Sequence, residues 1–191
     1  YSSAASDVYK RQLMKNYQVS SVYIGGGTPS SIDEQWIAAL MEGVFDCFNV
    51  LPDAEISIEC NPGTLSREKL LAYKDAGINR LSIGLQSANN DELKRLGRIH
   101  TFEQFVTNYE VARNVGFKNI NVDLMYGLPE QSASQYMATV NKIIRLHPDH
   151  ISAYSLIVEK GTPFYEKYKF DMVRQEAGMG TEFLPDEDEL Y

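Results

Sequence analysis

Short apolar runs alternate with longer amphipathic stretches along the chain from Leu13 onward. The apolar runs are rich in β-branched residues and end in turn-forming residues, a pattern that is typical of buried strands. There are five such runs: SVYI (21–24), EISIE (55–59), RLSIGLQ (80–86), NINVDLM (119–125) and HISAYSLIV (150–158). We therefore expect five β-strands.

The stretches between these runs have a helical period. We expect helices over 33–48, 66–77, 101–116 and 132–148. The second begins at Ser66, a good N-cap residue, and ends at Gly77, a common helix terminator. In the first, one face carries the apolar residues Ile37, Leu40, Met41, Val44 and Phe48.

The spacing of the strands predicts how they are connected. Their ends fall near Ile24, Glu59, Gln86, Asp123 and Leu156, at intervals of 35, 27, 37 and 33 residues. One strand–helix unit takes about 30 residues or slightly more, so five consecutive units predict parallel strands in an α/β fold. A doubly wound sheet and a (β/α) barrel both fit this spacing, and both bind ligands at the carboxyl ends of their strands.

Polar residues or glycines stand at these strand ends, which favours the barrel because a barrel brings every end to one opening. Gly25, Gly26, Gly27 and Thr28 follow the first strand. Glycines let a ligand approach the backbone, and Thr28 adds a hydroxyl group. The pattern is neither a P-loop nor G-x-G-x-x-G, so it does not favour a nucleoside triphosphate or a classical dinucleotide.

Four more polar residues are candidates for ligand binding: Glu59, Gln86, Arg98 and Asp123. A carboxylate at a strand end needs a cationic or hydrogen-bonding partner, and a ligand amine or hydroxyl would serve. An arginine is suited to hold a ligand carboxylate through two parallel hydrogen bonds. Each residue taken alone also has an ordinary structural interpretation. Glu59, Gln86 and Asp123 share a position at strand ends, which favours a site, whereas Arg98 lies just before a helix cap.

Composition narrows the function further. The 191 residues carry a net charge of −8 and a sequence pI of about 4.9, which argues against a nucleic-acid partner or an anionic membrane surface. We see neither a membrane span nor a signal peptide. Cys47 and Cys60 have no paired spacing, so a reducing cytoplasmic location is expected. Residues 1–12 differ from the rest and resemble translated sequencing-adapter DNA, so we expect them to be non-native.

Five motifs, taken together, resemble the radical S-adenosylmethionine (SAM) family over about residues 18–168. They are IGGGTPS, IECNPGTL, RLSIGLQSANNDELKRLGRIH, NVDLMYGLPEQ and SLIVEKGTPF. The most similar branch contains the oxygen-independent coproporphyrinogen III oxidases and the HemW-type heme chaperones, both proteins of porphyrin and heme metabolism. The resemblance implies a partial (β/α)₆ barrel, a four-iron four-sulfur cluster bound by C-x-x-x-C-x-x-C, and SAM on that cluster. Reduction of the cluster then cleaves SAM to methionine and a 5′-deoxyadenosyl radical.

The resemblance also assigns residues to SAM. Gly26, Gly27 and Thr28 match the part of the GGGTP motif that contacts the methionine moiety, and Gln86 matches a SAM-contacting glutamine. Glu59 matches the glutamate of E-x-N-P. Arg98 is implied as a carboxylate or hydroxyl partner and Asp123 as a ribose partner. No catalytic or metal-binding residue is assigned.

The chain departs from the family pattern because it contains no C-x-x-x-C-x-x-C. We expect an internal fragment: a barrel over 13–168 without the first strand and its cluster loop, and a linker over 169–191 toward a further domain. We expect this fragment alone to bind no cluster and to be inactive.

SLIVEKGTPF resembles the corresponding segment of the chaperone branch, and this resemblance implies a chaperone that binds porphyrin or heme and delivers heme to apoproteins. An oxidase that decarboxylates propionates to vinyl groups remains the alternative. A non-catalytic α/β module that binds a small ligand is the third interpretation.

Overall fold

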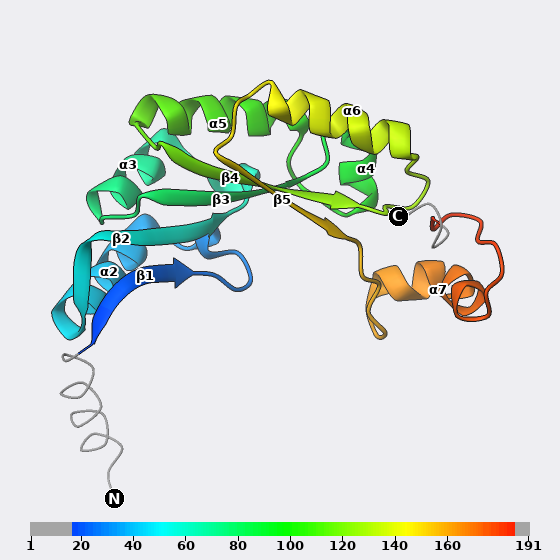
Figure 1. Cartoon of the computed structure of the whole chain (residues 1–191), viewed down its shortest axis with the longest axis horizontal. Helices are drawn as coiled ribbons and strands as arrows, with labels where there is room; N and C mark the ends of the chain where they lie inside the picture. Colours follow the sequence, from blue (N-terminus) through cyan, green and yellow to red (C-terminus); the bar gives the residue numbers. More distant parts are fainter. Residues whose placement is uncertain (1–16, 186–191) are drawn as a thin grey trace, which may run out of the picture. The chain divides into compact units, whose positions relative to one another are not determined.

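The computed structural model describes residues 17–185, so the expected non-native segment 1–12 lies outside the described residues. The chain alternates strands and helices (Figure 1). The strands are β1 (Gln18–Ile24), β2 (Asn49–Cys60), β3 (Arg80–Gln86), β4 (Asn119–Tyr126) and β5 (His150–Ser155). The helices are α2 (Glu34–Cys47), α3 (Arg67–Asp75), α4 (Asn90–Arg95), α5 (Phe102–Val115), α6 (Ala133–Ile144) and α7 (Pro163–Glu176), with 3₁₀ turns η1 (Pro29–Ser31) and η2 (Pro62–Thr64).

The five strands form one sheet in the order β1-β2-β3-β4-β5, and both β1 with β2 and β2 with β3 pair in parallel. The predicted parallel α/β architecture is therefore confirmed. The register between β1 and β2 is irregular, because Val19 pairs with Val50 whereas Ser21 pairs with Glu55. Pro52 lies in this irregular stretch, where a residue without a backbone N–H is tolerated.

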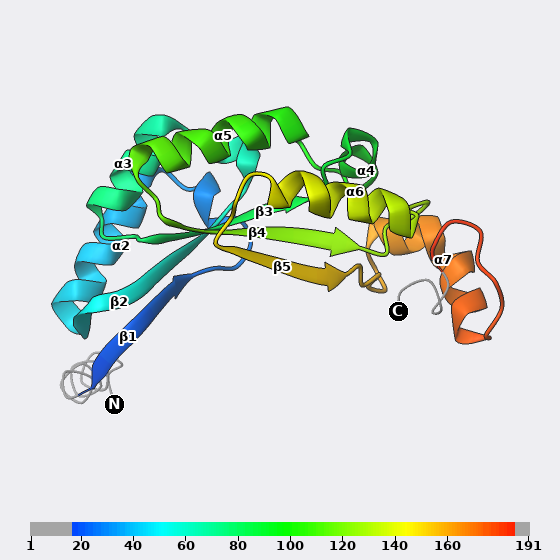
Figure 2. The ribbon, with the colours of Figure 1, turned by 45° about the horizontal axis from the view of Figure 1, so that its top comes forward.

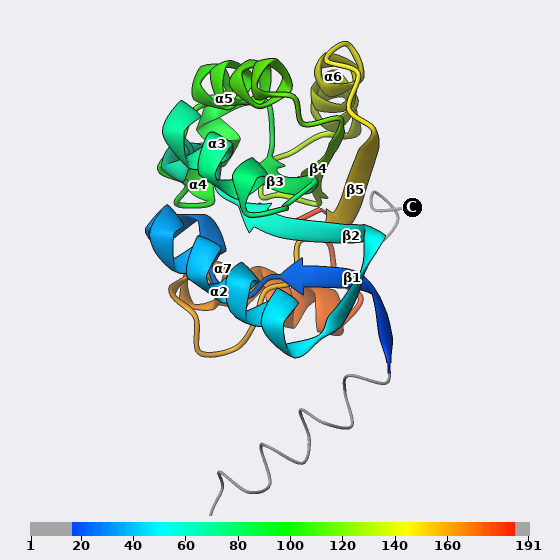
Figure 3. The same ribbon diagram turned by 90° about the vertical axis from the view of Figure 1, so that its left-hand side faces the viewer.

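The described chain divides into two compact units. Unit 1 contains residues 17–83 and Val106–Asn121, and unit 2 contains Gly84–Phe105 and residues 122–185. In unit 1, α2 and α3 lie on the same side of β1 and β2 (Figure 3). The core of this unit is formed by fully buried residues of α2, α3 and β2, namely Ile37, Met41, Ile58, Leu70 and Tyr73.

In unit 2, α6 runs alongside β4 and β5 and in the opposite direction (Figure 2). Leu124 and Ile143 have no exposed surface and belong to the core of this unit. Asp171 of α7 is also buried, and its carboxylate accepts hydrogen bonds from the backbone N–H groups of Glu182, Phe183 and Leu184 at 3.2, 2.6 and 2.9 Å. These bonds fix the segment after α7.

Two expectations about single elements need correction. The apolar face predicted for α2 is too wide, because Leu40 is 50% exposed and Phe48 is 37% exposed. Only the stripe that contains Ile37 and Met41 is buried, since one row of side chains is enough to contact the neighbouring elements. The fifth strand ends at Ser155 rather than at residue 158.

The pattern also did not predict α4 or α7. The expected domain boundary at residue 168 falls within α7. Among residues 17–185, no helix is both long and apolar enough to cross a membrane.

Candidate functional site

The three glycines after β1 differ in what they require of the backbone. A Cβ atom on Gly25 would lie 2.5 Å from Cε1 of Tyr23 and 3.2 Å from Cδ of Glu59, so a side chain there would have to displace the Tyr23 ring. Gly26 and Gly27 have positive φ angles of 93° and 61°, which L-residues with a side chain rarely adopt. Glycine is therefore favoured at position 25 by the lack of space for a side chain beside the Tyr23 ring, and at positions 26 and 27 by the positive φ angles.

Glu59, at the end of β2, is fixed by the segment that follows β1. Its Oε1 accepts a hydrogen bond from the hydroxyl of Tyr23 at 2.6 Å, and its Oε2 accepts one from the backbone N–H of Gly26 at 2.9 Å. The carboxylate is half-buried and has a defined orientation. Two of the predicted ligand-binding segments thus meet directly in unit 1.

Further hydrogen bonds connect the loop after β1 with the loop after β2. The Oγ of Ser30, which has no exposed surface, lies 2.6 Å from the Oγ1 of Thr64 and accepts the backbone N–H of Asn61 at 2.8 Å. The ammonium group of Lys69 donates to the carbonyl oxygens of Ser30 at 2.8 Å and Ile32 at 3.0 Å. These contacts join η1, η2 and α3, so the segment that follows the glycines is hydrogen-bonded to the segment that follows β2.

Gln86, the last residue of β3, is a buried amide in an unusual backbone conformation. It has a φ angle of 75° and is 4% exposed. Its Oε1 accepts a hydrogen bond from the hydroxyl of Tyr154 in β5 at 2.8 Å. Sequence reasoning did not single out Tyr154, because a tyrosine within an apolar strand gives no signal that distinguishes it from a core residue.

The remaining predicted residues occupy three different settings. Thr28 is exposed between the glycines and η1, and Asp123 is half-buried within β4. Arg98 is half-buried in the turn after α4, and its backbone N–H donates to the carbonyl oxygen of Leu93 at 2.9 Å.

The predicted residues fall into two sets. Unit 1 contains Gly26, Gly27, Thr28 and Glu59, and unit 2 contains Gln86, Arg98 and Asp123. Within the first set, the structure joins Gly26 to Glu59. The convergence of all five strand ends on one opening stays a prediction.

The cysteines do not fit an iron–sulfur cluster. Cys60 is buried at the end of β2, and burial raises the pKa of its thiol far above the usual value, whereas cluster ligands are thiolates. Cys47 is the last residue of α2. Within residues 17–185 there is also no group of three or more His, Cys, Asp or Glu side chains that could hold a metal ion. No cluster-binding role is therefore assigned to these residues.

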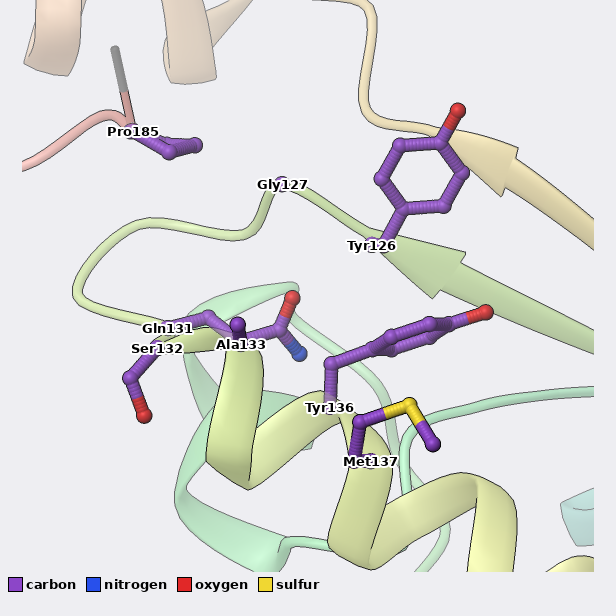
Figure 4. Close-up of a pocket in the computed structure, with 8 residues that line it drawn as sticks. All are labelled: Tyr126, Gly127, Gln131, Ser132, Ala133, Tyr136, Met137 and Pro185. Atoms are coloured by element: carbon purple, nitrogen blue, oxygen red, sulfur yellow. The ribbon is translucent and has the colours of Figure 1, made fainter. Parts of the chain in front are cut away.

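A pocket of about 240 Å³ opens in unit 2 between the end of β4 and the first turn of α6 (Figure 4). The rings of Tyr126 and Tyr136 lie there with centroids 5.7 Å apart and planes tilted by 55°. Burial raises the pKa of Tyr136, and no lining residue carries a charged side chain. None of the predicted SAM-binding residues lines this uncharged pocket.

Comparison with known proteins agrees with the motifs. The profile of the Radical SAM superfamily matches residues 7–143. The chain is 42% identical over 148 residues to the heme chaperone HemW of Bacillus subtilis, an alignment that covers 77% of this chain and 39% of that protein. It is 37% identical over 174 residues to HemW of Escherichia coli, covering 91% of this chain and 43% of that protein. The chain thus spans about two fifths of the length of these relatives.

A solved structure shows the same fold. The coproporphyrinogen III oxidase HemN from Escherichia coli, described as a radical SAM enzyme, superposes with a TM-score of 0.79 at 28% identity. The match covers 95% of this chain and 40% of that one. The expected partial radical SAM barrel is therefore the fold class of this chain, and the use of SAM and a four-iron four-sulfur cluster is a property implied by the family. The chain belongs to the radical SAM superfamily.

Proposed function

We propose that Gly26, Gly27, Thr28 and Glu59 bind SAM. The contact that carries this proposal is the pair of hydrogen bonds from Tyr23 and Gly26 to Glu59, which leaves a half-buried, oriented carboxylate beside an exposed glycine backbone. A fixed carboxylate suits the ammonium group of an amino acid, and exposed backbone groups suit its carboxylate. Because both partners are fixed before the ligand arrives, binding loses less conformational entropy.

The proposal extends to Gln86, Arg98 and Asp123 in unit 2 as further SAM-binding residues. Gln86 holds a strained backbone conformation and a buried amide, which is a combination that occurs at ligand sites. Arg98 supplies a cation, and Asp123 an anion that suits hydroxyl groups. When bound together with a reduced cluster, SAM supplies a carbon-centred radical, and the residues named here would bind and orient it.

At the level of the whole protein, we propose a heme chaperone of the HemW type, which binds heme and delivers it to apoproteins. The identities of 42% and 37% to two HemW proteins support this choice. SLIVEKGTPF supports it as well. Oxidation of coproporphyrinogen III is the second candidate, and the structural similarity to HemN favours it.

A direct comparison of two activities tests this choice in the full-length protein that contains the chain. Heme is titrated into the purified protein and followed by its visible absorption, and the same preparation is assayed for protoporphyrinogen formation from coproporphyrinogen III. We expect saturable heme binding without product formation. Product formation at catalytic turnover would instead assign the protein to the oxidases.

A further inference from the structure

A fully buried carboxylate lies outside the proposed SAM-binding set. Glu92, on the short helix α4, has no exposed surface. Its Oε2 accepts hydrogen bonds from the hydroxyl of Ser87 at 2.5 Å and from Nε2 of Gln131 at 2.9 Å. Burying a carboxylate is costly unless hydrogen-bond donors replace the lost water, so Glu92 depends on the donors of Ser87 and Gln131.

The two donors come from two different loops of unit 2. Ser87 directly follows Gln86 at the end of β3, and its Oγ also accepts the backbone N–H of Asn89 at 3.0 Å. Gln131 follows β4, and its Oε1 accepts the backbone N–H of Leu128 at 3.3 Å. Glu92 therefore ties together the carboxyl-terminal loops of β3 and β4.

The loop after β3 needs such an anchor because Gln86 adopts a left-handed conformation. For a residue with a Cβ atom this conformation is strained, so surrounding contacts must maintain it. Lys142 contributes by donating from Nζ to the carbonyl oxygen of Ala88 at 3.0 Å. Glu92 accepts the hydrogen bond from Ser87, the residue between Gln86 and Ala88.

We propose that Glu92 is a positioning residue for SAM binding. It fixes the backbone at Ser87, and this in turn presents Gln86 in the geometry that the cofactor requires. The inference rests on the proposed role of Gln86 in SAM binding. Glu92 itself does not contact the cofactor.

The test measures SAM affinity by equilibrium dialysis in the full-length protein. Glu92→Met removes the acceptor but keeps an unbranched side chain, and it leaves the donors of Ser87 and Gln131 without their partner. We expect SAM affinity to fall on the order of tenfold, as for a lost hydrogen bond to a charged group, and thermal unfolding of the same variant measures the loss of stability that accompanies it. Glu92→Gln keeps an oxygen at the same place and should restore most of the affinity.

Asp91→Met is the matched control, because Asp91 is the neighbouring acid on α4 and its side chain is 81% exposed. We expect wild-type affinity for this variant. Ser87→Ala removes the donor without touching a charge, and we expect it to weaken SAM binding in the same direction as Glu92→Met. An unchanged affinity in either Glu92→Met or Ser87→Ala would overturn the inference.

A double-mutant comparison separates positioning from general destabilisation. If Glu92 acts through Gln86, Glu92→Met should cause no further loss of affinity in a Gln86→Ala background. Additive losses would contradict the inference. Wild-type affinity of Gln86→Ala alone would overturn the proposed SAM site and this inference with it, whereas a weakened Gln86→Ala beside an unaffected Glu92→Met would overturn only the inference.

Discussion

At the scale of single residues, the position of the Tyr23 ring depends on the absence of a side chain at Gly25. Tyr23 is 62% exposed, yet it takes one fixed position because its hydroxyl is bonded to Glu59 and its ring passes beside Gly25. A side chain at position 25 would therefore have to displace the same ring that orients the carboxylate. Glycine at this position keeps the hydrogen bond from Tyr23 to Glu59 in place.

Gly25→Ala should displace the Tyr23 ring, because the new Cβ atom would lie 2.5 Å from it. Since Tyr23 is exposed, the ring can swing outward, and the cost in stability should be about 1 kcal/mol, the value of one hydrogen bond. SAM affinity should fall as Glu59 loses a donor. Calorimetric titration and thermal unfolding of the full-length protein measure the two effects.

Gly43→Ala is the control for this change, because a Cβ atom on Gly43 of α2 would meet no atom within 4 Å. It should leave SAM affinity unchanged and stabilise the helix by about 0.5–1 kcal/mol. Equal SAM affinities for Gly25→Ala and the wild type would contradict the steric account.

Residue identities at the strand ends were predictable from the sequence, but most of their partners were not. Glu59 and Gln86 stand where apolar runs stop, and that signal is local. Tyr154 and Ser30 bond to residues that are 68 and 31 positions away in the chain. Such pairs depend on how strands and loops are brought together, which periodicity does not specify.

At the scale of elements, strands with clear turn signals were predicted well and short helices were not. The helix expected over 66–77 begins at the Ser66 cap and is followed by Gly77, as its end signals indicated. In contrast, α4 has six residues, too few to show a helical period. The pattern did not indicate α7 either, although Thr162 caps this helix and Pro163 is its first residue.

The pH dependence of stability tests the link between α7 and the segment after it. Burial of Asp171 acts to raise its pKa, but hydrogen bonds from three backbone N–H groups outweigh this and lower the pKa. A lowered pKa adds stability above the ordinary aspartate pKa of about 3.9, and this stability is lost as the pH falls through the lowered value. Asp171→Asn should therefore destabilise the full-length protein at neutral pH by about 1–3 kcal/mol.

The difference in unfolding free energy between the wild type and Asp171→Asn should narrow as the pH falls below the ordinary aspartate pKa of about 3.9 and through the lowered pKa of Asp171. Urea unfolding at a series of pH values measures it. Glu166→Gln on the same helix removes an exposed partner of Lys169 and should leave the pH profile unchanged. A difference that stays constant down to the lowest pH would show that the Asp171 carboxylate does not hold this segment.

At the scale of the whole molecule, the sequence predicted the architecture because five strand–helix units repeat at similar intervals. The family motifs predicted the use of SAM. The four-iron four-sulfur cluster is implied by the family alone, since the described residues contain no group of side chains that could hold a metal ion. The proposed function of the complete protein therefore depends on whether this chain supplies the residues that bind SAM.

Titration of SAM into the full-length protein and its Glu59→Gln variant tests this claim most directly. Glu55→Gln is the control, because Glu55 lies on the same strand but forms an exposed ion pair with Arg80 at 3.0 Å. We expect Glu59→Gln to bind SAM on the order of tenfold more weakly, with heme affinity unchanged, and Glu55→Gln to bind as the wild type does. Equal SAM affinity in all three proteins would contradict the assignment of the glycine loop and Glu59 as the SAM site.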